Sequence, residues 1–337
     1  MTLWDRARHA DRRPALLARN RIAAAFRRWL EVEGFTEADP SALVASPGNE
    51  VHLHAFSVSP PEGPAAWLHT SPEFAMKKLL AAGETRLFAL SPVFRARETG
   101  SPLHAPAFTM LEWYRSHTPY ETLFEDVGAL LREAATVTGA AVWRWRDRSC
   151  DPLAPPDRLT VAEAFQRHAG VDLLATLGAD GRGDRDGLAR QLGAQSVRVG
   201  EDDTWSDLFA RVLVQCVEPH LGAGRATILH DYPLAEAALA RPAAHDPRLA
   251  ERFELYVCGV ELANGFGELT DPSEQRRRFE ADMAEKARRY GERYPIDEDF
   301  IAALGHMPPA SGCALGFDRL VMLATGAPDV RTVMWAP

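Results

Sequence analysis

Two glutamates on a predicted hairpin have the spacing that points most directly to chemistry. A two-residue turn of the form Cys258-Gly259 separates two runs of β-forming residues. Tyr256 is then expected opposite Glu261, which makes Glu254 and Glu261 diagonal neighbours on one face. Two such carboxylates favour a cation between them, and Mg²⁺ shared with a polyphosphate suits their oxygen ligands. A solvated hairpin face without an ion is the alternative.

Two further polar residues follow the hairpin. Asn264 and Glu268 lie in a segment flanked by glycine. An acidic centre beside a metal site suggests capture of a cationic group.

Residues 86–115 contain two β-type runs around a polar loop. Arg95 closes the first run, and period-two counting puts Phe108, Glu112 and Tyr114 on one face of the second. A carboxylate among apolar neighbours needs a partner. We therefore interpret this face as a binding pocket, with half-buried core as the alternative.

Glu73 has two interpretations. Thr70 followed by Glu73 has the form of a helix capping box, and Pro72 suits a first helical turn. The functional alternative is that Glu73 faces an ammonium group of a ligand. From this segment alone, the cap is favoured.

Near the C-terminus, a strand containing Gly316 runs directly into an apolar helix that begins with Asp318-Arg319. Backbone N–H groups and an arginine at a helix start can bind an anion, and glycine lets a flat ring or phosphate approach the backbone. A tight junction that needs glycine for packing explains the same pattern equally well.

The elements expected to position these residues are less specific. Periodicity predicts a helix from Pro14 to Gly34, and a charged helix at 272–290 that is most simply a solvated face. Short helices are expected within an inserted region at about 151–225. The histidines without ligand spacing, which we treat as structural, are His52, His54, His220, His230, His245 and His306.

Composition indicates a globular, intracellular protein. The chain has 337 residues, of which 46% are hydrophobic, and a net charge of −9, which argues against a broad polyanion-binding surface. The four cysteines are far apart, so neither a zinc knuckle nor a disulfide framework is predicted. No apolar run approaches a membrane span. We expect a cytoplasmic protein that does not associate with membranes.

Taken together, these blocks resemble the class II aminoacyl-tRNA synthetases. The segment 34–40 is similar to motif 1, residues 94–112 to motif 2, and residues 316–319 to motif 3. The blocks Thr-Ser-Pro-Glu at 70–73 and Glu-Leu-Ala-Asn-Gly-Phe at 261–266 resemble the lysyl branch. The resemblance covers nearly the whole chain.

This resemblance implies an α+β fold in which an antiparallel β-sheet flanked by helices carries the active site. We expect one catalytic domain over residues 1–337, containing the helical insertion, and a homodimer formed through motif 1. Because the motif 1 helix begins near residue 14, the sequence leaves no room for an anticodon-binding domain, and we expect no tRNA partner.

A core of this kind resembles the lysyl-type paralogues that activate (R)-β-lysine with ATP and Mg²⁺ and attach it to a lysine side chain of elongation factor P. Ala314 supports this, because lysyl-tRNA synthetases usually have glycine there. One methyl group at a pocket wall is worth only about 1 to 3 kcal/mol of discrimination. The expected substrates are therefore β-lysine or lysine, ATP, and elongation factor P as acceptor.

The resemblance also assigns roles. Catalytic residues would be Arg95, Arg319 and Glu261. ATP would contact Arg95, Glu98, His104, Phe108, Glu261, Leu262, Gly316 and Arg319. The amino acid would contact Ser71, Pro72, Glu73, Glu112, Tyr114, Asn264, Glu268 and Ala314. Magnesium would be held by Glu254 and Glu261.

The motif 2 loop departs from the family pattern. It reads Arg95-Ala-Arg-Glu98 and is one residue longer up to His104, so Glu98 rather than Arg97 is the preferred adenine reader. Ala105 and Ala107 replace two polar residues. These changes leave open a stand-alone adenylating enzyme with another amino acid or acceptor. A non-catalytic ATP-binding paralogue is the third hypothesis.

Overall fold

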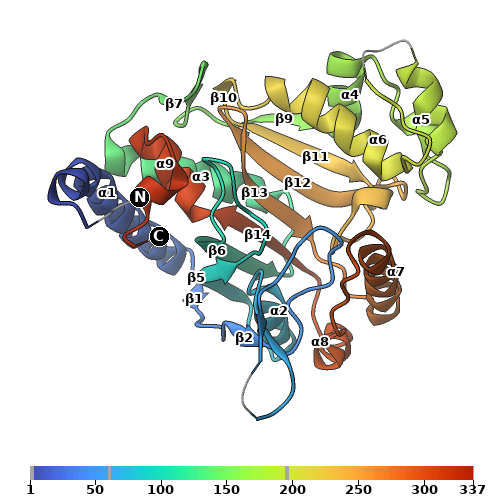
Figure 1. The fold of residues 1–337 in the computed structure, drawn as a ribbon, viewed down its shortest axis with the longest axis horizontal. Coiled ribbons are helices and arrows are strands. Elements are labelled where there is room, and N and C mark those ends of the chain that lie inside the picture. The colour runs from blue at the N-terminus through green and yellow to red at the C-terminus, as the bar shows by residue number, and fades with distance from the viewer. Residues whose placement is uncertain (1–3, 60–61, 194–196, 337) are drawn as a thin grey trace. The chain divides into compact units, whose positions relative to one another are not determined.

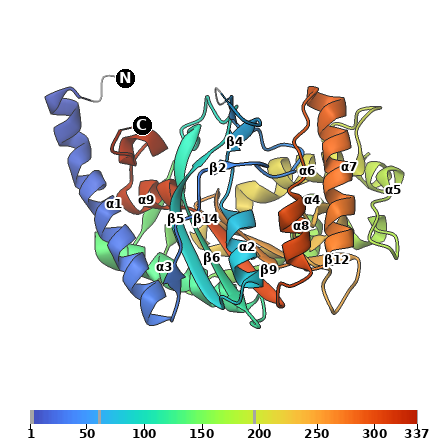
Figure 2. The same cartoon turned by 90° about the horizontal axis from the view of Figure 1, so that it is seen from below.

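A computed structural model describes residues 4–59, 62–193 and 197–336 of the chain. Contacts divide the chain into two compact units. Unit 1 comprises residues 1–119, 129–140 and 270–337, and unit 2 comprises residues 120–128 and 141–269. Figures 1 and 2 show the elements from two directions.

Unit 1 is built on four paired strands. β1 lies parallel to β5, while β5, β6 and β14 pair antiparallel in that order. A separate small sheet has the order β2-β4-β3. The strands of unit 1 are β1 (Thr36–Glu37), β2 (Leu43–Val44), β3 (Ser57–Val58), β4 (Ala66–Leu68), β5 (Arg86–Phe94), β6 (Ala107–Ser116) and β14 (Ala310–Gly316).

Helices cover both faces of the β5–β6–β14 sheet. Figure 2 shows α1 with α9 on one side of these strands, and α2 with α8 on the other. The helices of unit 1 are α1 (Arg6–Val32), α2 (Glu73–Ala81), α7 (Pro272–Tyr290), α8 (Glu298–Leu304), α9 (Phe317–Thr325) and the short η5 (Val330–Val333). α3 (Thr122–Thr138) begins in unit 2 and ends in unit 1.

Unit 2 is built on a second set of four strands. β13, β12 and β11 pair antiparallel, and β9 lies parallel to β11. Another small sheet has the order β10-β8-β7. The strands of unit 2 are β7 (Trp143–Trp145), β8 (Arg148–Asp151), β9 (Asp157–Thr160), β10 (Gly224–Arg225), β11 (Thr227–Pro233), β12 (Leu249–Val257) and β13 (Val260–Gly267).

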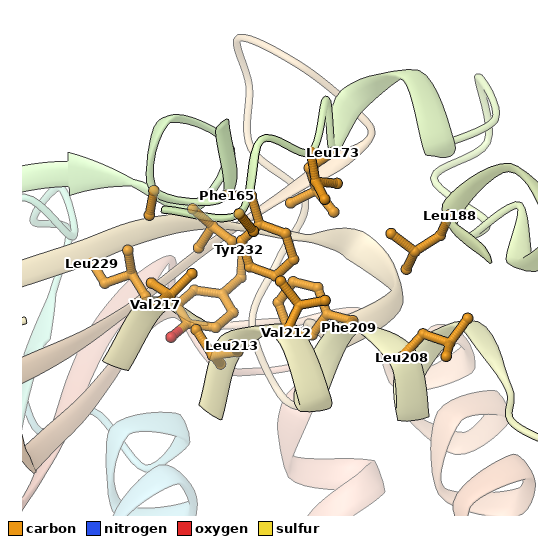
Figure 3. Close-up of a cluster of buried hydrophobic side chains, with 14 of the residues drawn as sticks. Phe165, Leu173, Leu188, Leu208, Phe209, Val212, Leu213, Val217, Leu229 and Tyr232 are labelled. Atoms are coloured by element: carbon orange, nitrogen blue, oxygen red, sulfur yellow. The ribbon is translucent and has the colours of Figure 1, made fainter. Parts of the chain in front are cut away.

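The segment about 151–225 contains most of the helices of unit 2, as the sequence predicted. They are α4 (Val161–Ala169), α5 (Arg185–Leu192), α6 (Trp205–Val212), η1 (Leu174–Thr176), η2 (Leu213–Val217) and η3 (Glu218–His220); η4 (Leu234–Glu236) follows β11. Each of α4 and α6 begins with a capping box. Their apolar faces pack on β11 in the cluster of Figure 3, where Phe165, Phe209 and Tyr232 lie together. That the region is an insertion stays a prediction.

The first helix begins earlier than its sequence pattern indicated. We expected it from Pro14 because the apolar residues have helical spacing from there on, but α1 starts at Arg6 and contains Pro14. The Asp5 side chain accepts a hydrogen bond from the Arg8 backbone N–H and caps this longer helix. Gly34 follows its end with a left-handed φ of 80°.

The antiparallel sheets flanked by helices match the expected fold class within each unit. Among the helices of the described ranges, none combines the length and apolar character needed to span a bilayer.

Candidate active site

Glu112 on β6 is a buried carboxyl group that accepts hydrogen bonds from two other expected site residues of unit 1. Its side chain is 1% exposed. The Ser71 hydroxyl donates to Oε1 at 2.6 Å, and the Tyr114 hydroxyl donates to Oε2 at 2.8 Å. Strand alternation places Glu112 and Tyr114 on the same face, as the sequence predicted. This face is therefore polar at its centre and is not ordinary core.

The environment of Glu112 favours its protonated form. Burial and the neighbouring Glu73 raise its pKa to about 8, although Ser71, Tyr114 and Arg95 act in the opposite direction. A cation placed beside this carboxyl would restore the charged form, because an opposite charge favours ionisation. The group is thus suited to receive an ammonium.

Glu73 does not form the capping box that its spacing suggested. α2 begins after Pro72 without a side-chain cap, and the Thr70 hydroxyl donates instead to the Pro47 carbonyl at 2.6 Å. The Ser71 hydroxyl accepts from the Glu73 backbone N–H at 3.0 Å. The Glu73 carboxylate faces the buried Lys77, with Nζ to Oε1 at 2.5 Å. That prediction was wrong because Thr70 bonds to the distant Pro47 and Glu73 pairs with Lys77 on its own helix.

Arg95 follows β5 and lies beside two expected site residues, Glu98 and Phe108. Its Nε donates to the Thr70 carbonyl at 3.1 Å. Its Nη1 lies 3.6 Å from Oε1 of Glu98, and its guanidinium lies 5.4 Å from the centre of the Phe108 ring. The structure therefore places an arginine, a carboxylate and an aromatic ring close together in motif 2, where the loop meets β5 and β6.

His104 and Arg319 approach the same loop from different elements. Arg319 in α9 donates through Nε to the Leu103 carbonyl at 3.1 Å. Burial, together with the charges of Arg319 and Arg95, lowers the pKa of His104, while Glu98 opposes them. The imidazole is therefore neutral near pH 7, and the two arginines supply the positive charge.

Asp318, next to Arg319, has a structural role that its sequence position did not reveal. It is 1% exposed, pairs with Arg19 of α1, and accepts from the Thr109 backbone N–H at 2.7 Å. Arg19 also donates to the Thr109 hydroxyl at 2.7 Å. This cluster joins α1, β6 and the first turn of α9, so it fixes the position of the neighbouring Arg319.

β14 supplies the remaining expected contacts of unit 1. Ala314 lies opposite Glu112 across the β6–β14 ladder, and Gly316 lies opposite Met110. Cross-strand neighbours share a face. Ala314 therefore adds its methyl group beside the buried carboxyl, where a change of side-chain volume would be felt.

In unit 2, the predicted hairpin is confirmed with one addition. β12 and β13 join through Cys258-Gly259, and Tyr256 lies opposite Glu261. A bulge then shifts the register, so Glu254 lies opposite Asn264. Without that extra residue Glu261 and Asn264 would face opposite sides of the strand; the bulge brings both to the face of Glu254.

The residues around this bulge differ in burial. Leu262 is 2% exposed and packs inward. The Oδ1 atom of Asn264 is buried and has no hydrogen-bond partner among the described residues. Glu268 lies just beyond β13 and is 1% exposed. Its backbone forms an isolated antiparallel β-bridge with Ala240. An unused amide oxygen is an acceptor suited to an ammonium group.

Glu254 is not the bare carboxylate that the sequence suggested. Its Oε1 accepts from Arg252 at 2.8 Å, and its Oε2 accepts from the hydroxyls of Tyr232 at 2.6 Å and Tyr256 at 2.7 Å. Burial and the charge of Glu254 raise the pKa of both tyrosines, which keeps them hydrogen-bond donors. The positive partner missing from the prediction is Arg252.

This donor set can still accept a magnesium ion. A carboxylate has about four lone-pair positions, and three of those on Glu254 are used. Within the described residues, no group of three or more His, Cys, Asp or Glu side chains is arranged to hold a metal. Mg²⁺ commonly takes one or two carboxylates together with substrate phosphates. Glu254 and Glu261 fit that shared kind of site.

Sequence reasoning missed four partners. Lys77 lies four residues after Glu73, a helix spacing that could have revealed the pair. Arg252 and Tyr256 each lie two residues from Glu254, a strand spacing that puts them on its face. Tyr232 comes from β11, and only the strand pairing reveals it.

Comparison with known proteins identifies the family. Residues 3–337 match the family of class II tRNA synthetases of the D, K and N group. The chain belongs to this family, which confirms the resemblance and the fold class drawn from its motifs.

Its relatives include proteins named elongation factor P–(R)-β-lysine ligase. The relative from Pectobacterium carotovorum is 38% identical over 325 residues, which cover 95% of this chain and 93% of the relative. The relative from Edwardsiella ictaluri is 39% identical with the same coverage. The relative from Salmonella paratyphi B is 38% identical over 327 residues, covering 95% and 94%.

Proposed function

We propose that this chain is an ATP-dependent ligase that activates (R)-β-lysine, or lysine, as an adenylate and transfers it to a lysine side chain of elongation factor P. The observation that carries this proposal is the identity of 38–39% to ligases of that name along 95% of the chain. A match at this level over more than nine-tenths of both chains favours a shared substrate.

The polar face of β6 supports a cationic amino acid. Glu112 is buried and protonated near neutral pH until a positive charge approaches it. Ser71 and Tyr114 donate to Glu112, Glu73 lies beside it, and Ala314 is its cross-strand neighbour. We propose that Pro72 also contacts the amino acid. We propose that Ser71 and Glu73 serve the backbone end of the amino acid and that Tyr114 serves its distal ammonium. Asn264 and Glu268 in unit 2 would supply further acceptors.

The nucleotide roles follow the family resemblance. Arg95 would hold the α-phosphate and the amino acid carboxylate, a bidentate task suited to a guanidinium. Arg319 would hold the γ-phosphate with His104 at the phosphates. Phe108 and Glu98 would contact adenine, as would the backbone at Leu262 and Gly316. When Mg²⁺ is bound by Glu254 and Glu261, it would neutralise the charge of pyrophosphate.

Two displacement steps complete the reaction. In the first, a carboxylate oxygen of the amino acid bonds to the α-phosphorus while the bond to pyrophosphate breaks. In the second, the amine of the acceptor lysine bonds to the carbonyl carbon, AMP leaves, and the amine loses a proton to solvent. Neither step needs a protein nucleophile, so the contribution of Arg95 and Arg319 is positioning and charge stabilisation.

The altered motif 2 loop motivates a second candidate, a stand-alone adenylating enzyme with a different amino acid or acceptor. A non-catalytic ATP-binding paralogue is less well supported, because Arg95, Glu254, Glu261 and Arg319 are all present. We also propose a cytoplasmic homodimer that acts without tRNA.

Amino-acid-dependent exchange of pyrophosphate into ATP tests the proposal. (R)-β-Lysine, α-lysine and a panel of other amino acids would be compared, with Glu261→Ala as the inactive control. We expect β-lysine to support exchange best, and labelled β-lysine to transfer to elongation factor P but not to its variant lacking the acceptor lysine. Exchange with another amino acid only would favour the second candidate. ATP binding without any exchange would favour the third.

A further inference from the structure

Arg97 has a backbone conformation that is unusual for its residue type. Its φ is 68°, in the left-handed region that non-glycine residues rarely adopt. The preceding residue, Ala96, donates its N–H to the His54 carbonyl at 2.6 Å. The carbonyl of Arg97 accepts from the Thr99 N–H at 3.0 Å. Such a conformation persists where surrounding contacts determine it, so these contacts are the place to look for a purpose.

The Arg97 side chain is directed to Glu292, which follows α7. Glu292 pairs with Arg97 through Oε1 and with Nδ1 of His54 through Oε2 at 2.8 Å. The Arg97 guanidinium also lies 5.5 Å from the centre of the Tyr290 ring. One carboxylate thus ties the motif 2 loop to the segment that contains His54. We call Arg97, His54, Tyr290 and Glu292 the Glu292 cluster.

The segment around His54 is itself held firmly by α7 and the residues after it. Lys286 is 0% exposed, and its Nζ donates to the carbonyls of Glu50 at 3.1 Å, Val51 at 3.0 Å and Leu53 at 2.5 Å. Tyr294 accepts from the Ala55 N–H at 2.9 Å. The Glu292 cluster therefore connects the motif 2 loop to a segment whose backbone is held by Lys286 and Tyr294.

The path of Arg97 has a consequence for its neighbours. The motif 2 loop is one residue longer than the family pattern, and it makes a left-handed turn at Arg97. Arg97 leaves toward α7, and Glu98 returns to within 3.6 Å of Arg95. Arg97 thus anchors the loop to the segment after α7, while Arg95 and Glu98 are the two residues that would contact ATP.

We propose that the Glu292 cluster is a positioning device that fixes the Arg95–Glu98 pair and thereby sets the affinity for ATP. The assignment of ATP to that pair rests on the proposed function. The competing explanation is an ordinary surface ion pair, because the Arg97 side chain is 54% exposed and such pairs contribute little. The two differ in what happens to ATP when Arg97 is removed.

Direct titration of ATP into the full-length protein tests the proposal. Arg97→Ala and Glu292→Gln should each raise the Kd for ATP by about tenfold, since small displacements of binding groups have large effects. Arg97→Lys should recover part of the loss because it restores a cation opposite Glu292. Arg277→Ala is the matched control: Arg277 pairs with Glu274 on the surface of α7, away from the loop, and its loss should leave the Kd unchanged.

Hydrogen exchange of the ligand-free proteins, followed on peptides covering residues 95–104, separates positioning from direct contact. Arg97→Ala should speed exchange in this loop but not in β6. An unchanged Kd overturns the proposal. A raised Kd with unchanged loop exchange also overturns it, because Arg97 would then contact ATP itself. If the wild type binds ATP but supports no pyrophosphate exchange, the proposed function fails while both measurements still decide on the Glu292 cluster.

Discussion

The buried carboxyl of Glu112 joins binding to stability at the scale of a single residue. Its surroundings satisfy both oxygens with hydroxyl donors yet provide no direct cation partner in the described structure. A carboxyl kept in this state costs little while protonated and is costly when ionised without a partner. We infer that the Glu112 site favours binding of a positively charged group, such as the ammonium of a lysine-type substrate.

The raised pKa of Glu112 predicts that the stability of the fold depends on pH. The pKa of Glu112 is about 8 in the folded chain, against an ordinary value of 4.5. Between these values the folded state holds a proton that the unfolded state has lost, so stability falls as pH rises. This group contributes about 1.4 kcal/mol per pH unit in that window. Glu112→Gln should therefore show a shallower fall than the wild type.

Urea unfolding at several pH values from about 5 to 8 measures the difference. Acids far from Glu112 affect both proteins equally, so the comparison reports on Glu112 and its neighbour Glu73. Parallel curves for the two proteins would show that Glu112 is already ionised in the fold.

Sequence reasoning reached some of these residues and not others. Period-two counting placed Phe108, Glu112 and Tyr114 on one face because a strand has only two faces. The capping-box spacing was misleading for Thr70 and Glu73, because Pro47 binds the side chain of Thr70 and Lys77 that of Glu73. Arg252 was not predicted as the partner of Glu254, although its two-residue spacing puts it on the same face, because the pairing also depends on side-chain rotamers.

At the scale of elements, the β12–β13 hairpin depends on a bulge and a glycine. The turn and its register were predictable because Cys258-Gly259 is a strong local signal. The bulge at Leu262 was not, because the residue types around it do not reveal where the alternation shifts. It nevertheless decides which side Asn264 faces.

Gly265 sits beneath the ring of Phe253, and we predict that it tolerates no side chain. A Cβ added there would lie 2.2 Å from Cε1 of Phe253, which is fully buried. Gly265→Ala should cost about 1 to 3 kcal/mol of unfolding free energy. The penalty should shrink in a Phe253→Leu background, as a double-mutant cycle would show. Gly305→Ala, where the nearest atom is 3.5 Å away, is the control with no expected loss.

The Arg19–Asp318 pair joins three elements of unit 1, and its loss should be felt in the fold. Asp318 is 1% exposed and Arg19 is 13% exposed. Arg19→Ala leaves a buried charge without its partner, which typically costs about 3 to 5 kcal/mol. Adding Asp318→Asn removes that charge and should recover part of the loss. If Arg19→Ala unfolds at the urea midpoint of the wild type, the pair is not a structural link.

At the scale of the whole molecule, composition predicted a globular chain but could not predict its division. Unit 1 is assembled from three separate segments of the chain, and unit 2 from two. Such discontinuity follows from strand pairing over long sequence distances, which periodicity does not encode. The motif resemblance located the family, because motifs are local strings, but it carried no information on how the chain divides.

Leu208 belongs to a buried cluster that lies wholly within unit 2, and this predicts that core substitutions act locally. Leu208 in unit 2 and Leu16 in unit 1 are both 0% exposed. Replacing either by alanine should cost about 2 to 5 kcal/mol, from lost burial and the cavity left behind. Leu208→Ala should speed hydrogen exchange in α4, α6 and β11, which share its cluster, whereas Leu16→Ala should speed exchange in α1 and α9. Equal acceleration throughout the chain by either variant would mean that the molecule opens as one cooperative body, because local opening would then cost as much as global unfolding.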